Sequence, residues 1–259
     1  MKLHALESIL RAHAPLVVAY SGGVDSACLL AVAHRTLGGK ALGVIADSPS
    51  LPRQALADAL DVARRFGANI EVVRTDELND PRYAANPMNR CYFCKAELFQ
   101  RLDALARERG FAAIAYGENA DDPAHLRPGS QAAAEFSIIA PLKQAGLTKA
   151  DVRALSRELG LPTADAPAQP CLSSRIPHGT PVTPEALALV ERGEAFVRSL
   201  GFRVFRVRYL ASVPPVARLQ VAPEEMGGLQ ELRGAIESGL RHAGFGGVEI
   251  DPAGYRSAA

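Results

Sequence analysis

The chain has 259 residues, of which 48% are hydrophobic and 22% are charged, and its formal net charge is +1. A chain of this size can bury one large core, or a medium core with a small second domain, and its composition excludes a disordered or collagen-like protein. Because the charge is balanced, a nucleic-acid partner is not expected. Glu7 stands where a signal peptide would begin its apolar region, and no run of about 18 apolar residues follows, so we expect a cytoplasmic protein with no membrane partner.

Short apolar runs alternate with longer helical patterns through the first part of the chain. Strands are expected at residues 15–20, 41–46, 70–73, 112–116 and 137–140, and helices at 25–35, 52–66, 94–109 and 149–159. The last of these helices has a capping box, Thr148 with Asp151, and ends at Gly160 before Pro162. Such alternation is typical of right-handed βαβ crossovers. It predicts an α/β domain with a parallel sheet covered on both faces.

The pattern then changes, because residues 162–184 are rich in Pro, Ser, Thr and Gly and lack periodicity. This composition predicts a long loop. Beyond it, helices are expected at 184–200 and 223–242, and strands at 204–209, 216–221 and 247–250. The αββαβ order predicts a small α+β domain. We therefore expect a first domain at 1–165, a cysteine-bearing linker loop at 166–183 and a second domain at 184–259.

A glycine pair follows the first predicted strand and precedes a helix, in the segment Ser21-Gly22-Gly23-Val24-Asp25-Ser26. Glycines let the backbone turn tightly and approach a ligand closely, and the unsatisfied amides at the helix start attract an anion. Ser21 and Ser26 add hydroxyl donors, and Asp25 is placed to hold a magnesium ion that bridges phosphates. A turn that only reverses the chain is the alternative. No Walker-type G-x-x-x-x-G-K-[ST] motif occurs in the chain.

This segment resembles the phosphate loop of the PP-loop ATP pyrophosphatases, which cleave ATP between the α and β phosphates, and the resemblance implies adenylation of a substrate oxygen. The turn Gly117-Glu118-Asn119-Ala120-Asp121-Asp122, after the fourth predicted strand, fits the same superfamily. Read alone, Asp121 and Asp122 before Pro123 would be a helix cap. The resemblance implies ATP-binding roles for Ser21, Gly22, Gly23, Asp25, Ser26, Ala46, Ser48, Gly117, Asn119 and Asp121, magnesium ligands Asp25 and Asp122, and catalytic roles for Asp25 and Ser26.

A closer resemblance covers nearly the whole chain. Residues 89–95, 127–129, 141–142, 170–177 and 254–257 are similar to the LarE family, and the Cys171-Leu172-Ser173-Ser174-Arg175 motif is far more specific than the phosphate loop. LarE proteins are sulfur transferases that make the nickel-pincer nucleotide of lactate racemase. The resemblance implies that ATP activates a carboxylate of pyridinium-3,5-biscarboxylic acid mononucleotide, that sulfur displaces AMP, and that a thiocarboxylate forms. A homo-oligomer and partners in nickel insertion or racemase maturation are expected.

Three cysteines carry the sulfur chemistry that this resemblance implies. Cys171 matches the catalytic cysteine that donates its own sulfur in one branch of the family. Chains that also have the Cys91-x-x-Cys94 pair resemble a branch in which three cysteines hold a [4Fe-4S] cluster, with one iron lacking a protein ligand and able to carry an extra sulfide. We expect the cluster form. A zinc site with His178 as fourth ligand, a redox-active pair, or no metal are the alternatives. Cys28 is expected to be a buried small hydrophobic residue.

Arg206 and Arg208 stand two positions apart in a predicted strand, so both guanidinium groups project from one face. Two neighbouring arginines suit bidentate capture of a substrate phosphate, and the family places phosphate-binding arginines on this strand. Arg175, in the Cys171 loop, is a third substrate-binding candidate, and a solvated edge face is the alternative. Residues 209–215 follow the strand where the family usually has a short His-Gly turn. The second domain is assigned to substrate phosphate binding and oligomerisation.

Other functions remain open from the sequence. A PP-loop tRNA thiolase uses the same adenylation chemistry, although the near-neutral charge and the lack of an evident RNA-binding appendage argue against it. An amide-forming ligase of the NAD-synthetase type would need no cysteine trio. A regulatory nucleotide-binding module would release no pyrophosphate, which the intact Asp25 and acidic turn disfavour. The expected partner is therefore a small-molecule nucleotide substrate.

Overall fold

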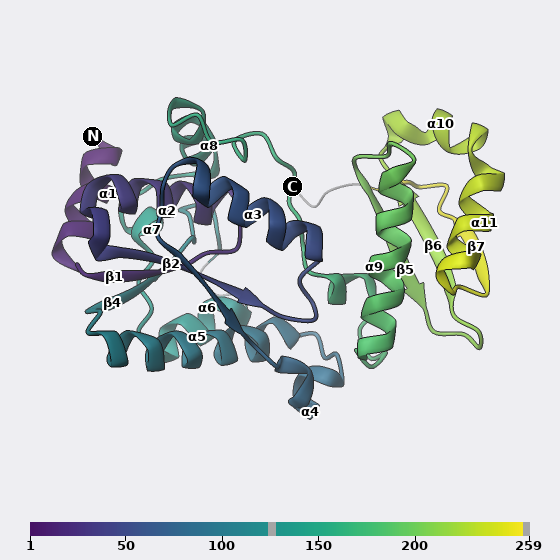
Figure 1. The fold of residues 1–259 in the computed structure, drawn as a ribbon, viewed down its shortest axis with the longest axis horizontal. Coiled ribbons are helices and arrows are strands. Elements are labelled where there is room, and N and C mark those ends of the chain that lie inside the picture. The colour runs from purple at the N-terminus through teal and green to yellow at the C-terminus, as the bar shows by residue number, and fades with distance from the viewer. Residues whose placement is uncertain (124–127, 256–259) are drawn as a thin grey trace. The chain divides into compact units, whose positions relative to one another are not determined.

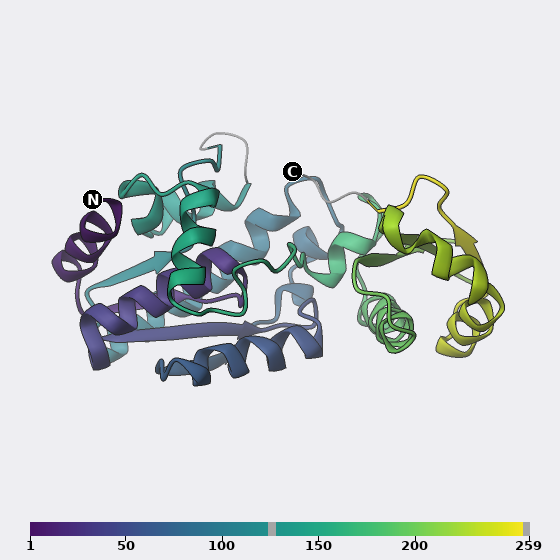
Figure 2. The same ribbon diagram turned by 90° about the horizontal axis from the view of Figure 1, so that it is seen from above.

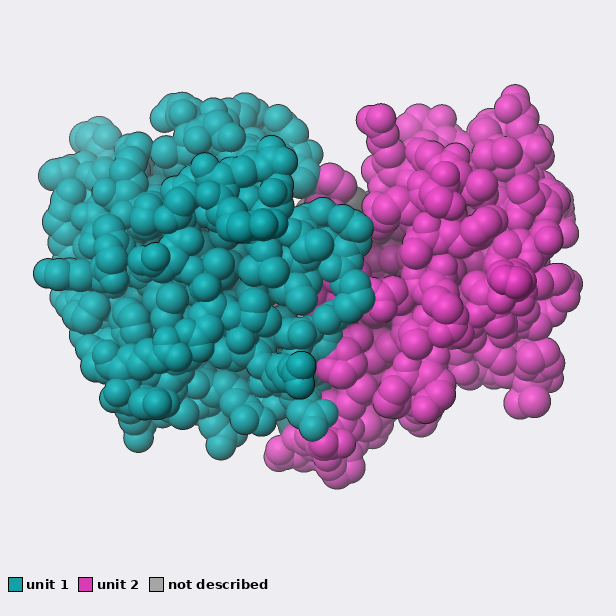
Figure 3. Space-filling view, in the orientation of Figure 1, with its two compact units in different colours: residues 1–48, 53–77, 89–166 teal, residues 49–52, 78–88, 167–259 magenta. Residues whose placement is uncertain are grey.

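The computed structural model describes residues 1–123 and 128–255, and it divides into two compact units (Figure 3). Unit 1 comprises Met1–Ser48, Arg53–Glu77 and Asn89–Ala166, and unit 2 comprises Pro49–Pro52, Leu78–Met88 and the chain from Pro167 onward. Unit 2 thus contains two short segments from the range assigned to the first domain, together with most of the linker loop. The functions assigned to the predicted domains stay predictions. Arg127, Arg256 and Ser257, which contribute to the family resemblance, lie outside the described residues.

Unit 1 is built on a parallel four-stranded sheet with the order β3-β2-β1-β4. The strands are β1 (Leu16–Ala19), β2 (Ala41–Asp47), β3 (Ile70–Arg74) and β4 (Ala113–Tyr116). Leu16 of β1 lies opposite Ala41 of β2 and Ala113 of β4. All four residues of β1 are buried, which is typical of a parallel strand covered on both faces. The predicted α/β architecture is confirmed.

Helices cover both faces of this sheet. The helical segments of unit 1 are α1 (Lys2–Ala12), α2 (Val24–Leu37), η1 (Gly38–Lys40), α3 (Arg53–Arg65), α5 (Arg90–Arg109), α6 (Pro128–Glu135), α7 (Pro141–Gln144) and α8 (Lys149–Glu158). Figure 1 shows α2 and α3 on one side of the strands and α5 on the other. Phe99 and Leu102 of α5 pack in one cluster with Val17 of β1 and Val44 of β2. No helix in the described part of the chain is long and apolar enough to cross a membrane.

Unit 1 differs from the sequence prediction in several elements, since helices α1, α6 and α7 were not predicted and two predicted elements changed. The strand expected at 137–140 is wrong, because Ile139 makes a single parallel bridge with Ala115 and Pro141 then begins α7. Ser137 has a φ of 54°, so the chain turns there instead of extending. Helix α5 begins before the predicted residue 94, which places both Cys91 and Cys94 in its N-terminal part.

Unit 2 contains a three-stranded sheet with the order β5-β6-β7. Strand β5 (Phe205–Leu210) is antiparallel to β6 (Val216–Val221), and β7 (Gly247–Ile250) is parallel to β6. Helices α9 (Pro184–Ser199) and α11 (Arg233–Ala243) lie on one face of this sheet (Figure 2). Val197, Phe205, Leu219 and Leu240 are buried between the helices and the strands. The predicted small α+β arrangement is confirmed.

The helix predicted at 223–242 is broken. The structure has η4 (Pro223–Glu225), α10 (Met226–Glu231) and α11 in its place, with Leu232 between the last two. Gly227 and Gly228 explain the weak first part, because glycine is an unfavourable residue in a helix interior.

The long loop before α9 is held by the two short segments that unit 2 takes from earlier in the chain. The loop contains η3 (Leu172–Arg175), and the earlier part of the chain contains η2 (Glu77–Asn79) and α4 (Pro81–Ala84). Leu172 N donates to Ser50 O, and Val182 N donates to Ala84 O, each at 2.8 Å. The buried Asn86 Nδ2 donates to two carbonyl oxygens of the loop, each at 2.8 Å. These bonds order a stretch that lacks periodicity of its own.

Candidate functional site

The glycine loop lies between β1 and α2, where the sequence predicts it. Gly22 has a φ of 77°, and an added Cβ would lie 2.6 Å from the Ala59 Cβ of α3, so glycine is required there. Gly23 is the N-cap of α2 and has no side chain to cover the first amides of this helix. These amides, with the positive end of the helix dipole behind them, can therefore receive an anion.

Ser21 and Ser26 are joined across this loop. Ser26 Oγ accepts a hydrogen bond from Ser21 N at 3.1 Å, lies 3.0 Å from Ser21 Oγ, and donates to Gly23 O at 3.1 Å. Ser26 is buried, whereas Ser21 is exposed. The loop therefore combines backbone amides with two hydroxyl groups whose positions are fixed by each other.

The acidic turn after β4 packs directly on this loop. A Cβ added to Gly117 would lie 2.8 Å from Ser26 N and 3.0 Å from Asp25 C, so the contact requires a glycine. Asn119 is buried, and its Nδ2 donates to Asp25 Oδ1 at 3.4 Å. Asn119 N donates to Asp122 Oδ2 at 3.1 Å. The structure thus brings the predicted residues of the turn and of the loop together within unit 1.

Asp25 and Asp121 both contact a residue that the sequence patterns do not mark. Lys149 is the first residue of α8, and its Nζ lies 2.6 Å from Asp25 Oδ2. Lys149 N donates to Asp121 Oδ2 at 2.7 Å, so Asp121 supports the start of this helix beside the capping box of Thr148. Lys149 and Asp25 are 124 positions apart, and no local pattern could predict their pairing.

Glu118 is buried within the acidic turn, and its carboxylate accepts three hydrogen bonds. The donors are Tyr116 OH, Ser130 Oγ at 2.8 Å and Lys143 Nζ at 3.3 Å. Burial alone would raise the pKa of Glu118, but these donors and the charge of Lys143 outweigh it and hold the pKa below its ordinary value. Burial, followed by the bond to Glu118, raises the pKa of Tyr116. The ionised carboxylate therefore fixes the turn that contacts the phosphate loop.

Ala46 and Ser48 lie at the end of β2, next to β1 in the sheet. Ala46 pairs with Val73 of β3, and Ser48 is buried with its carbonyl oxygen accepting from Arg53 Nη2 at 2.8 Å. Because the parallel strands β1 and β2 end at the same edge, both residues lie at the edge where open α/β sheets bind ligands. Their contact with adenosine stays a prediction.

The four cysteines differ in exposure. Cys28 is fully buried, as predicted, and burial raises the pKa of its thiol to about 11. Cys91 is exposed and Cys94 is half-buried, and their spacing of three residues on α5 places them on neighbouring positions of one helix face. Cys171 belongs to unit 2, where it is the half-buried N-cap of η3. Within residues 1–123 and 128–255 no group of three or more His, Cys, Asp or Glu side chains could hold a metal, so the iron–sulfur and magnesium ligand sets stay predictions.

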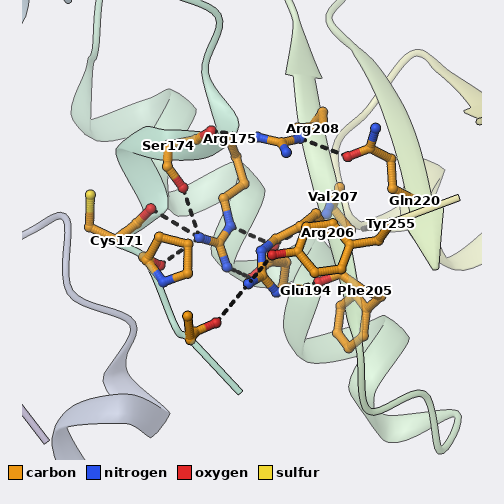
Figure 4. Close-up of polar contacts among 12 residues, drawn as sticks. Cys171, Ser174, Arg175, Glu194, Phe205, Arg206, Val207, Arg208, Gln220 and Tyr255 are labelled. Carbon is orange, nitrogen blue, oxygen red and sulfur yellow. Dashed lines mark hydrogen bonds and ion pairs between the residues drawn. The ribbon is translucent and has the colours of Figure 1, made fainter. Parts of the chain in front are cut away.

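Arg175 organises the Cys171 loop (Figure 4). Its guanidinium group forms a bidentate pair with Glu194, with distances of 2.8 and 2.9 Å, and the two side chains are only 4% and 7% exposed. Its Nη1 donates to Cys171 O and to Ser174 Oγ, each at 3.0 Å. Because its donors already have acceptors inside unit 2, we assign Arg175 to holding the Cys171 backbone. Its contact with substrate stays a prediction.

Arg206 and Arg208 share one face of β5, as the alternation predicted, and this face is opposite to that of the buried Phe205 and Val207. Arg206 Nη2 donates to Tyr255 OH at 2.9 Å, and its guanidinium carbon lies 4.4 Å from the centre of the Tyr255 ring. Arg208 Nη1 donates to Ser174 O at 2.7 Å, and Nε donates to Gln220 Oε1 at 2.9 Å. Arg206 is 8% exposed, so the solvated-face alternative does not describe it.

These guanidinium groups form a region of concentrated positive charge. Burial lowers the pKa of Arg206 and of Arg208, and the neighbouring charge of Arg175 lowers each further. Among the described residues, Glu194 forms its ion pair with Arg175, and the negative charges of Glu194 and Asp251 offset these effects on Arg208 only in part. The charge on Arg206 and Arg208 is therefore incompletely compensated, and an anion such as a phosphate would be attracted here.

Three buried hydroxyl groups form a ring beside the Cys171 loop. Ser50, Tyr83 and Ser173 are each at most 2% exposed. Their oxygens are 2.7 Å apart for Ser50 and Tyr83, 2.9 Å for Ser50 and Ser173, and 2.7 Å for Tyr83 and Ser173. Each hydroxyl can donate to one neighbour and accept from the other. Ser173 follows Cys171 by two positions, so the ring fixes the loop that carries the thiol.

The fold and the first of these sites define a PP-loop protein, with a glycine loop after the first strand of a parallel sheet and an acidic turn after the neighbouring strand. GMP synthase [glutamine-hydrolyzing] of Thermomicrobium roseum is similar, with 29% identity over 220 residues, which is 71% of this chain and 39% of that protein. No protein-family model matches the chain.

Two further relatives match almost the full length. An uncharacterised protein of Synechocystis sp. is 43% identical over 243 residues, which is 93% of this chain and 90% of that protein. Pyridinium-3,5-bisthiocarboxylic acid mononucleotide synthase of Lactiplantibacillus plantarum is 33% identical over 243 residues, which is 93% of this chain and 87% of that protein. The chain therefore belongs to the family of this synthase, the LarE family, as its motifs predicted.

Proposed function

We propose that this protein is an ATP-dependent sulfur transferase that converts a carboxylate of pyridinium-3,5-biscarboxylic acid mononucleotide into a thiocarboxylate, for nickel-pincer nucleotide synthesis. The observation that carries this proposal is the contact between the Cys171 loop and the arginine cluster, where Arg208 Nη1 donates to Ser174 O at 2.7 Å. A cysteine and an anion-attracting group thus belong to one unit. The name of the L. plantarum relative describes a mononucleotide with two thiocarboxylic groups, which suits both features.

The phosphate loop of unit 1 supports the activation step. Its amides and hydroxyl groups would hold the phosphates of ATP, and the carboxylate oxygens of Asp25 and Asp122 suit magnesium, which would neutralise phosphate charge. A carboxylate oxygen of the substrate attacks the α-phosphorus of ATP, the bond to the β-phosphate oxygen breaks, and pyrophosphate leaves. The acyl-adenylate then has AMP as its leaving group, which the carboxylate itself lacks.

The sulfur step has two versions. In the sacrificial version, the Cys171 thiolate attacks the acyl carbon, AMP leaves, and elimination from Cys171 transfers its sulfur and leaves dehydroalanine. In the version that we propose, Cys91, Cys94 and Cys171 would hold a [4Fe-4S] cluster that supplies an exchangeable sulfide. Cys91 is exposed and Cys94 and Cys171 are half-buried, which suits cluster ligation, whereas the buried Cys28 is unsuited to it.

Cysteine variants purified without oxygen test these versions. Replacing Cys91, Cys94 or Cys171 with Ala should remove most iron and acid-labile sulfide while ATP binding persists, and Cys28→Ala is the matched control that should keep both. With sulfide supplied, thiolated product should exceed one sulfur per chain. A single turnover with loss of one H₂S from Cys171, indifferent to Cys91 and Cys94, would contradict the cluster. Tight zinc without labile sulfide would contradict both versions.

Arginine variants test substrate binding. The double change of Arg206 and Arg208 to Ala should raise KM for the phosphorylated substrate much more than it lowers kcat, because these groups would bind a part of the substrate remote from the reaction. Arg208→Ala alone should act in the same direction. Arg218→Ala is the control, because Arg218 lies on the neighbouring strand β6 but pairs with the exposed Glu249. An unchanged KM in the double variant would refute this role.

The expected partners belong to the same proposal. They are a small-molecule nucleotide, a second copy of this chain, and proteins of nickel insertion or racemase maturation. A salt-sensitive gel shift with bulk tRNA would favour the tRNA-thiolase alternative.

A further inference from the structure

We propose that Gln220 is a positioning residue for Arg208, and that its neutral amide leaves one terminal nitrogen of this guanidinium group available for the substrate phosphate. Gln220 lies on β6, next to the strand that carries Arg208. This inference rests on the phosphate role of the arginines in the proposed function. It assigns a role to an uncharged residue that no motif of the sequence includes.

Two acceptors from different elements hold the guanidinium group of Arg208. Nε donates to Gln220 Oε1 at 2.9 Å, and Nη1 donates to Ser174 O of the Cys171 loop at 2.7 Å. No hydrogen bond to the described residues uses the other terminal nitrogen, Nη2, which carries two N–H donors. Arg208 is only half-buried. The two contacts therefore fix the direction of a donor group that an anion can use.

Arg206 differs, because both of its terminal nitrogens already have acceptors. Nη1 donates to Phe205 O at 2.6 Å, and Nη2 donates to Ala168 O at 3.0 Å and to Tyr255 OH at 2.9 Å (Figure 4). Arg206 therefore adds positive charge to this region. Arg208 offers N–H donors that a phosphate can use without first displacing a protein group.

Gln220 is itself fixed from its other side by a carboxylate. Its Nε2 donates to Asp251 Oδ2 at 2.7 Å, and Asp251 Oδ1 accepts from Ala253 N at 3.0 Å. The bond from Gln220 lowers the pKa of Asp251, followed by the bond from Ala253, so the carboxylate stays ionised. These contacts set the orientation of the amide, because Nε2 must face the carboxylate and Oε1 then faces Arg208. Gln220 thus separates the charge of Asp251 from the guanidinium group.

The neutrality of Gln220 is the property that matters for binding. A carboxylate at this position would have two acceptor oxygens, which could pair with Nε and Nη2 of Arg208 in the bidentate geometry that arginine favours. Such a pair would neutralise the charge and occupy the nitrogen that the phosphate would use. The amide has one acceptor oxygen, since its nitrogen is a donor. It therefore orients the guanidinium group without competing with the ligand.

Ligand binding to full-length variants tests the proposal. The probes are pyridinium-3,5-biscarboxylic acid mononucleotide and the corresponding riboside, which lacks the phosphate. Gln220→Glu should weaken binding of the mononucleotide by about 10-fold or more and leave binding of the riboside unchanged. Gln220→Met removes the acceptor without adding a charge and should weaken mononucleotide binding by a smaller factor. In turnover, Gln220→Glu should raise KM with little change in kcat, because the phosphate is remote from the reaction.

A second glutamine provides the matched control. Gln230 is exposed on α10 in the same unit, so Gln230→Glu makes the same change of charge away from the arginines. It should bind both probes as the wild type does. Equal weakening of mononucleotide and riboside by Gln220→Glu would indicate a structural role and overturn the proposal, as would unchanged mononucleotide binding by both Gln220 variants.

A compensated double variant separates local pairing from overall charge. Adding Asp251→Asn to Gln220→Glu restores the net charge of unit 2, but the new carboxylate still lies beside Arg208. Weak binding of the mononucleotide should therefore persist, and recovery of wild-type affinity would overturn the positioning role.

The wild-type chain separates this inference from its premises. It should bind the mononucleotide more tightly than the riboside. Equal affinity for the two probes would overturn the phosphate role of the arginines and this inference with it. Failure to bind the mononucleotide at all would overturn the proposed function itself.

Discussion

The buried pair of Arg175 and Glu194 gives the sharpest prediction. Glu194→Gln keeps the shape of the side chain but removes its charge and turns an amide group toward the guanidinium of Arg175. The pair has distances of 2.8 and 2.9 Å, with side chains 4% and 7% exposed, so Arg175 would be left with a buried, uncompensated charge. Breaking a buried pair from one side costs about 3 to 5 kcal/mol of stability, and we expect about 3 kcal/mol here because the amide keeps one acceptor.

A surface pair in the same unit is the control. Arg218 and Glu249 lie 3.0 Å apart, but their side chains are 45% and 51% exposed. Glu249→Gln should therefore cost about 1 kcal/mol or less. The two variants make the same chemical change to the same type of pair, so burial is the variable that separates them.

Denaturant unfolding followed by far-ultraviolet circular dichroism measures both costs, because the chain has no tryptophan for fluorescence. Hydrogen exchange at Val207 adds a local probe, since its N–H donates to Glu194 Oε1 at 3.2 Å. Equal destabilisation by the two variants would refute the reasoning. The double change of Arg175 to Met and Glu194 to Leu should recover much of the loss, because apolar residues can replace a buried ion pair.

Three further results are expected. Asp25→Asn should lower pyrophosphate release by about 100-fold or more with the circular dichroism spectrum preserved, because the carboxylate acts on phosphate charge and not on the core, and near-normal release would contradict this. Brief alkylation at about pH 8 should modify Cys91 and spare Cys28, whose pKa burial raises to about 11; equal labelling in the mass spectrum would count against it. Hydrogen bonds from Lys2 and then Thr148 hold the pKa of Asp151 well below its usual range, so its stabilisation is present above about pH 4 and lost as the pH falls further. The difference in denaturation midpoint between the wild type and Asp151→Asn should therefore shrink below that pH.

Local patterns predicted most of the fold. Strands β6 and β7 begin and end at the predicted residues, because each apolar run is bounded by turn residues. The capping box of α8 is also confirmed, since it depends on two residues three positions apart. The strand expected at 137–140 fails because tertiary packing, not local preference, decides whether a short apolar run pairs.

The candidate sites were predicted only in part, because their missing members are distant in the sequence. Lys149 reaches Asp25 across 124 positions, and Glu194 reaches Arg175 from a different element. From the sequence alone, an acidic residue inside a helical pattern, such as Glu194, is interpreted as part of a solvated face. The sequence does not mark Gln220 either. Its Oε1 accepts from Arg208 Nε at 2.9 Å only because β5 and β6 pair.

The hydroxyl ring joins Ser50, Tyr83 and Ser173, and each of these residues comes from a different one of the three chain segments that form unit 2. A fragment that begins at Pro167 would contain the whole β5-β6-β7 sheet, yet it would lack two of the three hydroxyl groups and the carbonyl acceptor of Leu172 N. During synthesis, the segments around Ser50 and Tyr83 leave the ribosome long before Ser173 does. The hydroxyl groups of Ser50 and Tyr83 therefore cannot form their hydrogen bonds with Ser173 while the rest of unit 1 is still being synthesised. The loop that carries Cys171 is thus completed late, after the nucleotide loop has already been synthesised.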